Sequence, residues 1–205
     1  MNLESDAEKS KTKFIYEKKR LESIIRYNPK WNLVDLGGGV GLWTEYFAKK
    51  ISKVVLVERE EKFICLAKRN IKNKNIEFIQ SDVTAFNAKL NSFDVVFISG
   101  VTLYLDDEFL ISMMNKVKKY LKPNGIFIHR DAYGINKKFL LNKKQSENLK
   151  LEYSAVYRTK NEYDNIFINK YNFEKIYDED MYPDETKLNV RKETKLRIAI
   201  YKNIK

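Results

Sequence analysis

The chain of 205 residues lacks the residue types from which disulfides and cysteine-ligated metal centres are built. Cys65 is the only cysteine, which rules out an internal disulfide and any metal site made of several cysteines. No apolar run approaches the roughly 18 residues that a membrane-spanning helix needs. The first residues, MNLESDAEKSKTK, include no apolar signal region. From these absences we expect a cytoplasmic protein with no membrane partner.

Basic residues outnumber acidic ones, but they are not concentrated in one place. Lys and Arg number 39 against 28 Asp and Glu, which gives a net charge of +11, and no five basic residues stand in a row. Such an excess fits acidic partners such as RNA or phosphorylated metabolites, and it equally fits a solvated surface. The hydrophobic share of 43% and the charged share of 33% are typical of a globular chain.

Strand and helix patterns alternate along the first two thirds of the chain. Helices are expected at 5–27, 42–50, 60–70 and 108–121. Short apolar strands are expected at 31–36, 54–57, 76–79, 93–98 and 126–129. This alternation predicts an α/β fold with a parallel sheet that is covered by helices on both faces.

After residue 130 the pattern changes. The polar stretch 137–169 is expected to be helical, with Tyr153 and Tyr157 on one helix face. Two more strands, 173–177 and 196–201, are expected to close the sheet as a hairpin with a long loop. We therefore predict a single domain over 1–205 with a Rossmann-like, doubly wound, mostly parallel sheet of seven strands and an antiparallel last strand. Its parts are an N-terminal helical lid (1–29), a ligand-binding core (30–130) and a substrate-side segment (131–205).

A glycine-rich loop stands where the first strand meets the following helix, in the sequence Leu33 to Gly41, LVDLGGGVG. Glycines there allow positive φ angles and a close approach of a ligand to the backbone, and the helix start offers free N–H groups. The dinucleotide pattern G-x-G-x-x-G would need glycine or alanine at position 42, where the chain has Leu42. What fits is G-x-G-x-G, through Gly37, Gly39 and Gly41. A plain strand-to-helix turn is the alternative interpretation.

With Asp35 two residues before the first glycine, this motif resembles the class I S-adenosylmethionine-dependent methyltransferases of the small-molecule type. The fourth strand with Ser99-Gly100 at its end, and the turn before the fifth strand, resemble further motifs of that family. The resemblance covers about residues 30–130. It implies S-adenosylmethionine as methyl donor, with S-adenosylhomocysteine as its product.

Acidic residues at the ends of successive strands fit this resemblance. A carboxylate at Glu58 suits the two ribose hydroxyls of the cofactor. By the resemblance, Asp82 accepts from the adenine amino group, the Val83 N–H reaches the ring, and Asp35 meets the methionyl ammonium. A helix cap or a surface charge is the alternative for each acid taken alone. The predicted cofactor-binding residues are Asp35, Gly37, Gly38, Gly39, Gly41, Glu58, Arg59, Asp82, Val83 and Ser99.

Several kinds of methyl transfer are disfavoured by what stands at the expected positions. Cys65 falls in the second helix of the core, where we expect a small buried hydrophobe rather than a nucleophile. The segment Ser99-Gly100-Val101-Thr102 lacks the polar-Pro-Pro-aromatic tetrad of enzymes that methylate exocyclic base amines. The resemblance places an aspartate of metal-dependent enzymes where Ser99 stands, so no metal is expected.

The acceptor side should be built from residues near the strand ends. His129, the only histidine, and Tyr104 are the candidate catalytic residues, although a structural role is the alternative for His129. Arg130 suits a phosphate or carboxylate, unless Asp131 pairs with it. Core packing is the alternative for Tyr157, and a surface position for Tyr16. The candidate substrate-binding residues are Tyr16, Tyr104, Arg130, Tyr157 and Arg158.

The sequence thus predicts an enzyme that methylates N or O of a small, anionic metabolite. An RNA methyltransferase is the first alternative, because of the net charge of +11. A non-catalytic protein that binds S-adenosylmethionine is the second, because a fold does not establish an activity. The expected partner is a small molecule, with nucleic acid as the alternative, and the chain is expected to be a monomer or a homodimer.

Overall fold

A single seven-stranded sheet forms the centre of the molecule in the computed structural model, which describes residues 3–146, 151–183, 188 and 192–205. Its strands lie in the order β3-β2-β1-β4-β5-β9-β8. In chain order they are β1 (Asn32–Leu36), β2 (Lys53–Glu58), β3 (Ile76–Gln80), β4 (Phe93–Ser99), β5 (Leu121–Gly134), β8 (Phe173–Asp180) and β9 (Thr194–Asn203). Strands β1 to β5 pair in parallel, and β9 runs antiparallel to both β5 and β8. The predicted mostly parallel sheet with an antiparallel last strand is confirmed.

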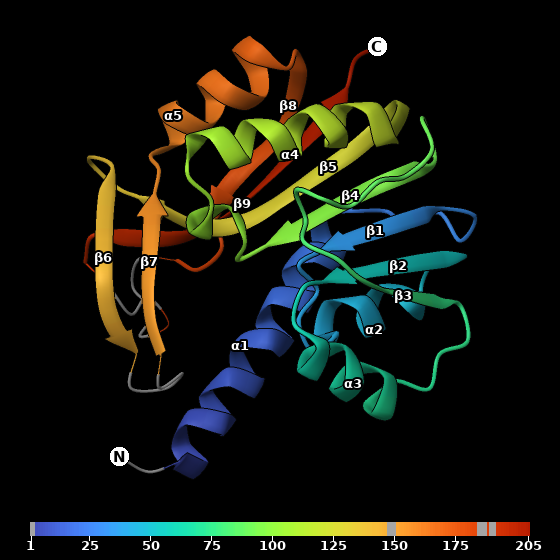
Figure 1. Ribbon diagram of the computed structural model, residues 1–205, viewed down its shortest axis with the longest axis horizontal. Coiled ribbons are helices and arrows are strands. Elements are labelled where there is room, and N and C mark those ends of the chain that lie inside the picture. The colour runs from blue at the N-terminus through green and yellow to red at the C-terminus, as the bar shows by residue number, and fades with distance from the viewer. Residues whose placement is uncertain (1–2, 147–150, 184–187, 189–191) are drawn as a thin grey trace.

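Helices cover both faces of this sheet (Figure 1). One side carries α1 (Leu3–Ile24), α2 (Leu42–Ala48) and α3 (Glu61–Asn70), and the other carries α4 (Asp107–Tyr120), α5 (Lys160–Asp164) and the π-helical turn η2 (Asn165–Lys170). Strand β4 shows why: Val95 and Phe97 belong to the core on the α1 and α2 side, while Val96 and Ile98 belong to the core on the α4 side. A strand that alternates between two cores must be apolar along its whole length. None of the described helices is both long and apolar enough to cross a lipid bilayer.

The segment 137–169 is not the helix that we predicted. It forms a hairpin of β6 (Phe139–Ser146) and β7 (Leu151–Tyr157), and helix begins only at Lys160. Ala155 and Tyr157 are buried against Leu103. Alternate apolar residues in a polar stretch follow the two-residue period of a strand with one covered face, which outweighed the helical spacing of the tyrosines.

Cys65 is exposed, so our expectation of a buried side chain was wrong. Helix α3 buries Ile64 and Ala67 against the sheet. Because an α-helix turns by about 100° per residue, the position after Ile64 points away from that face.

The turn that precedes the long core of β5 depends on one left-handed residue. Asn124 has a φ of 62°, between Pro123 and Gly125. Asparagine tolerates this conformation better than other residues with a β-carbon, and glycine tolerates it best.

We expect Asn124→Gly to raise the free energy of unfolding by up to about 1 kcal/mol, and Asn124→Val to lower it by roughly 1–2 kcal/mol, because a branched side chain is strained at this φ. Urea denaturation of the three proteins measures both changes. An unchanged midpoint for Asn124→Val would contradict the assigned turn.

Candidate active site

The glycine-rich loop links β1 to α2 at the carboxyl end of the sheet. The N–H groups of Gly37 and Gly38 donate to the carbonyl of Val57 at the end of β2, so the loop stays fastened to the neighbouring strand. Gly39 and Gly41 have φ angles of 55° and 83°. A β-carbon on Gly41 would lie 2.5 Å from the Ile71 Cδ1 atom, whereas one on Gly39 would meet nothing within 4 Å. Packing therefore excludes a side chain at Gly41, whereas a side chain at Gly39 would project into open space.

That space is a cavity of about 230 Å³, which we call the cofactor cavity because predicted cofactor-binding residues line it. Its walls are Asp35, Gly37, Gly38, Gly39, Val40, Leu42, Trp43 and Ser99. Half of the ten predicted cofactor residues therefore meet at one cavity. Val40, Leu42 and Trp43 were not predicted. Their signal was an apolar cluster at the first turn of a helix, which sequence reasoning assigns to packing by default, although Leu42 is exposed.

Asp35 is buried at the bottom of this cavity. Its carboxylate accepts a hydrogen bond of 2.6 Å from the Thr44 hydroxyl, which the first turn of α2 supplies. Burial raises the pKa of Asp35 to about 7; the Thr44 hydrogen bond opposes this shift, and the nearby charge of Glu58 adds to it. A cationic ligand beside Asp35 would favour the charged carboxylate.

Glu58 lies against the backbone of the glycine loop. Its Oε2 atom accepts from the Gly39 N–H at 3.0 Å, and its Oε1 atom accepts from the Glu60 N–H at 2.9 Å. The carboxylate is thus fixed beside the cavity, where a diol could share it with these amides. Arg59 follows it and is exposed, 3.9 Å from the Asp82 carboxylate.

Asp82 and Val83 follow β3, in the loop beside Glu58. The Oδ1 atom of Asp82 accepts from the N–H and the hydroxyl of Thr84, at 2.8 and 2.6 Å. The hydrogen bonds from Thr84 and the positive charge of Arg59 outweigh partial burial and lower the pKa of Asp82. The ionised carboxylate of Asp82 can accept a hydrogen bond from a ligand amino group through its Oδ2 atom.

Arg130 connects the cofactor cavity to the N-terminal helix. Its Nη1 donates to the Ser99 hydroxyl at 2.8 Å and its Nη2 donates to Glu17 of α1 at 2.7 Å. The guanidinium also lies over the Trp43 ring, 5.7 Å from its centroid. The alternative that Arg130 pairs with Asp131 was wrong, because Asp131 points to the opposite face of β5. Glu17 was missed, since nothing in the sequence relates it to position 130.

His129 lies inside the core and makes no contact with the cavity. It is fully buried, 2.9 Å from the Thr102 hydroxyl and 2.6 Å from the Tyr133 hydroxyl. Burial, and to a lesser extent the charge of Arg158, lower the pKa of His129 to about 3. The imidazole is therefore neutral and shielded from any methyl acceptor. This position fits the structural role that was the alternative interpretation of His129.

Asp131 belongs to the same cluster and holds the turn after β4, η1 (Thr102–Tyr104). Its carboxylate accepts from the N–H and the hydroxyl of Thr102, at 2.9 and 2.6 Å. Tyr163 contacts the same hydroxyl from α5. The cluster positions the backbone beyond Ser99, so it supports the site without entering it.

Three of the predicted substrate residues lie away from the cofactor cavity. Arg158 is 1% exposed and donates to the Asp107 carboxylate and to the Leu105 carbonyl. Tyr157 is buried against Phe139, with the ring centroids 5.8 Å apart. Tyr104 is 54% exposed in η1. The structure therefore does not bring these three side chains to the candidate site.

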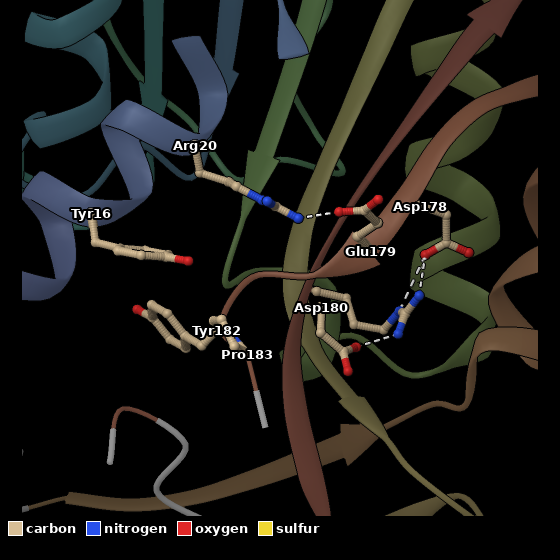
Figure 2. A pocket seen from close by; sticks show the side chains of 8 residues that line it. Tyr16, Arg20, Asp178, Glu179, Asp180, Tyr182 and Pro183 are labelled. Carbon is tan, nitrogen blue, oxygen red and sulfur yellow. Dashed lines mark hydrogen bonds and ion pairs between the residues drawn. The ribbon is translucent and has the colours of Figure 1, made fainter. Parts of the chain in front are cut away.

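Tyr16 lines a second cavity, of about 440 Å³, between α1 and the ends of β8 and β9 (Figure 2). Its walls are Tyr16, Arg20, Asp178, Glu179, Asp180, Tyr182, Pro183 and Arg197. The Tyr182 hydroxyl donates to Glu17, which also accepts from Arg130. A chain of hydrogen bonds through Tyr182, Glu17, Arg130 and Ser99 thus joins the two cavities.

Substitutions of Gly39 and Gly41 distinguish the role of the cofactor cavity in binding from the role of loop packing in stability. We expect Gly39→Ala to cost about 1 kcal/mol of stability for its positive φ and to lower the affinity for S-adenosylhomocysteine by about ten-fold or more, because its methyl group enters the cavity. Gly41→Ala should cost about 3 kcal/mol, because overpacking against Ile71 adds to the same strain. Calorimetry and urea denaturation check the pair; wild-type affinity in Gly39→Ala would remove the cavity as the cofactor site.

Comparison with known proteins shows which domain the chain resembles. Residues 33–125 match a family model described as a methyltransferase domain. Phosphoethanolamine N-methyltransferase 1 of Triticum aestivum is 33% identical over 109 residues, which make up 49% of this chain and 21% of that protein. The aligned part thus spans about a fifth of the curated relative.

Solved structures extend the likeness to nearly the whole chain. A putative S-adenosylmethionine-dependent methyltransferase from Listeria monocytogenes superposes with a TM-score of 0.74 at 19% identity, covering 92% of this chain and 98% of that one. Phosphoethanolamine N-methyltransferase 1 of Haemonchus contortus, in complex with phosphoethanolamine and S-adenosylhomocysteine, gives 0.73 at 17% identity and covers 93% of this chain and 43% of that one. Residues 33–125 of the chain therefore match a methyltransferase domain, and nearly the whole chain has the fold of S-adenosylmethionine-dependent methyltransferases.

Proposed function

We propose that this protein transfers the methyl group of S-adenosylmethionine to N or O of a small, anionic metabolite, with a phosphorylated amine such as phosphoethanolamine as the leading candidate. One observation carries the proposal: Arg130 of β5 is paired with Ser99 at the end of β4, and its guanidinium is hydrogen-bonded to the Ser99 hydroxyl in the wall of the cofactor cavity. A planar cation with several donors suits the phosphate or carboxylate of an acceptor. Two similar proteins, from Triticum aestivum and Haemonchus contortus, are phosphoethanolamine N-methyltransferases, which supports the same class.

The residues around the cavity fit the cofactor. In this proposal Glu58 accepts hydrogen bonds from the ribose hydroxyls and Asp82 accepts one from the adenine amino group. Asp35 lies beside the methionyl ammonium. The open space before Gly39 lets the ligand approach the loop backbone. All three acids lie at the carboxyl ends of neighbouring parallel strands, where ligands of such sheets bind.

The chemistry asks little of the protein beyond placement. The bound cofactor supplies an activated methyl group, and the acceptor displaces it in line. Holding the two reactants in the correct relative position can lower the activation barrier by several kcal/mol. A general base is needed only for an acceptor that arrives protonated. Since His129 is buried and neutral, and Tyr104 does not line the cofactor cavity, we propose neither residue as that base.

RNA is the second candidate acceptor, because the chain carries a net charge of +11. Contacts with phosphates of a nucleic acid would make the affinity fall steeply as salt rises. Arg158 and Arg197, however, lie in internal ion pairs. Their charges are matched within the fold, which favours the small acceptor.

Incubation with S-adenosylmethionine and phosphoethanolamine should yield a product heavier by one CH2 per transfer, detected by mass spectrometry. We expect Arg130→Lys to raise the KM for this acceptor by about ten-fold without changing the affinity for S-adenosylhomocysteine, because one ammonium cannot replace the planar fork. Arg69→Lys, on the exposed side of α3, is the matched control. Turnover of bulk tRNA with a steep salt dependence, and none of phosphoethanolamine, would reverse the order of the two candidates.

Cofactor affinity should depend on pH through Asp35. Its pKa is raised from 3.8 to about 7, so between these pH values the folded chain holds a proton that the unfolded chain has lost. Asp35 therefore lowers the free energy of unfolding progressively as the pH rises towards 7. A ligand ammonium lowers that pKa again. Affinity for S-adenosylmethionine should therefore rise from pH 6 to 7, by at most about ten-fold, with release of a proton.

Calorimetry in two buffers of different ionisation enthalpy measures that proton. Asp35→Asn should show neither the release nor the rise, and Glu77→Gln, an exposed acid of β3, serves as control. An identical pH profile for Asp35→Asn would contradict the assigned role.

A further inference from the structure

The Arg130 guanidinium is only partly used by its neighbours. Its Nη2 donates to Glu17 and its Nη1 to Ser99, but the buried Nε–H has no acceptor among the described residues. A buried donor without a partner costs about 1–3 kcal/mol of stability. Such a donor in a native fold calls for an explanation, and an absent ligand is one.

Two other arginines of the same protein show what complete pairing looks like. Arg158 donates from Nε and Nη2 to the Asp107 carboxylate, at 2.8 and 2.5 Å. Arg197 donates from the same two nitrogens to Asp178, at 3.1 and 2.7 Å. These nitrogens form one edge of the planar guanidinium, and in both arginines they donate together to a single carboxylate oxygen, the Oδ1 atom. On Arg130 that edge is half empty.

Glu17 does not fill it, since its two carboxylate oxygens accept from two different residues. Oε2 accepts from Arg130, while Oε1 accepts from the Tyr182 hydroxyl. Glu17 is 3% exposed, although it stands on the N-terminal helix. Burial and the adjacent Glu17 raise the pKa of Tyr182, so its hydroxyl stays a neutral donor. Three donors therefore face a group with two oxygens.

The surroundings fit a larger oxyanion. Tyr182 lines the cavity of about 440 Å³, whose other walls include Tyr16 and Arg20 (Figure 2). On the opposite side, Ser99 lines the cofactor cavity. A group held at Arg130 thus lies between an open cavity and the methyl donor. A tetrahedral phosphate monoester offers three free oxygens for the three donors, whereas a carboxylate offers two.

We propose that Nε and Nη2 of Arg130, together with the Tyr182 hydroxyl, form a phosphate seat for the acceptor, and that Glu17 is an internal anion which the acceptor displaces. The proposal rests on the proposed function only for the identity of the molecule that carries the phosphate. It adds a residue of α1 that competes with the substrate. A ligand that must displace an internal group binds more weakly, by the fraction of time that the seat is free.

Removing the charge of Glu17 should therefore strengthen phosphate binding. We expect Glu17→Gln to bind inorganic phosphate about ten-fold more tightly than the wild type, measured by calorimetry at constant ionic strength against chloride. Glu8→Gln removes the same charge from an exposed position of the same helix and should bind like the wild type. The gain should vanish in the double variant Glu17→Gln with Arg130→Met.

Acetate tests the shape of the seat, and we expect it to bind Glu17→Gln about ten-fold more weakly than phosphate, because it engages fewer donors. Equal binding of the two anions would overturn the assignment to phosphate. A gain of less than about two-fold in Glu17→Gln, or a gain that survives Arg130→Met, would overturn the seat itself.

A second measurement needs no variant at position 17. The 15N-edited signal of the Arg130 Nε–H, assigned by its absence in Arg130→Met, should shift when the wild type is titrated with phosphate and not with chloride. An unshifted signal at saturating phosphate would also overturn the seat. Calorimetry with S-adenosylhomocysteine on the same protein keeps the two proposals apart, since failure to bind it would refute the proposed function and leave the phosphate result standing.

Discussion

The register of the parallel strands is the constraint on which the candidate site depends. Leu36 of β1 pairs with Val57 of β2 and with Ile98 of β4. The next residue on each strand is therefore Gly37, Glu58 or Ser99, and Ser99 in turn pairs with Arg130 of β5. One row across the sheet thus brings the start of the glycine loop, an acid, a hydroxyl and a guanidinium to the same edge. A shift of one residue in any of these pairs would turn the side chain to the other face.

Residues at that edge could be predicted because their signal is local. Apolar runs gave the strands, and a polar residue just after such a run must lie at the strand's end. Asp35, Gly39 and Ser99 line the cavity, and they were selected because the short motifs around them resemble those of the family. The end of an apolar run led to His129, but it could not say which face of β5 the side chain would occupy. The neighbours Thr102 and Tyr163 that bury it come from other elements.

Contacts between distant segments set the limit of prediction. Glu17 meets Arg130 and Tyr182 because α1 crosses the end of the sheet, and no pattern around position 17 encodes that crossing. The β6–β7 hairpin was missed for a related reason. Its polar outer positions resemble those of a solvated helix, and only packing of Ala155 on Leu103 shows that the covered positions repeat every second residue. Propensity and period are local, whereas the partner that selects between them is not.

Electrostatics at the site is arranged around charges that lack a full set of partners. Asp35 is buried beside Glu58, so its ionisation is disfavoured until a cation arrives. Arg130 holds a single carboxylate that it shares with Tyr182, so its edge stays incomplete until a larger anion arrives. The two groups lie on either side of Ser99, which lines the cofactor cavity and accepts from Arg130. A methyl donor with an ammonium group and an acceptor with a phosphate would each satisfy one of them, and under our proposal the two molecules would bind on either side of Ser99.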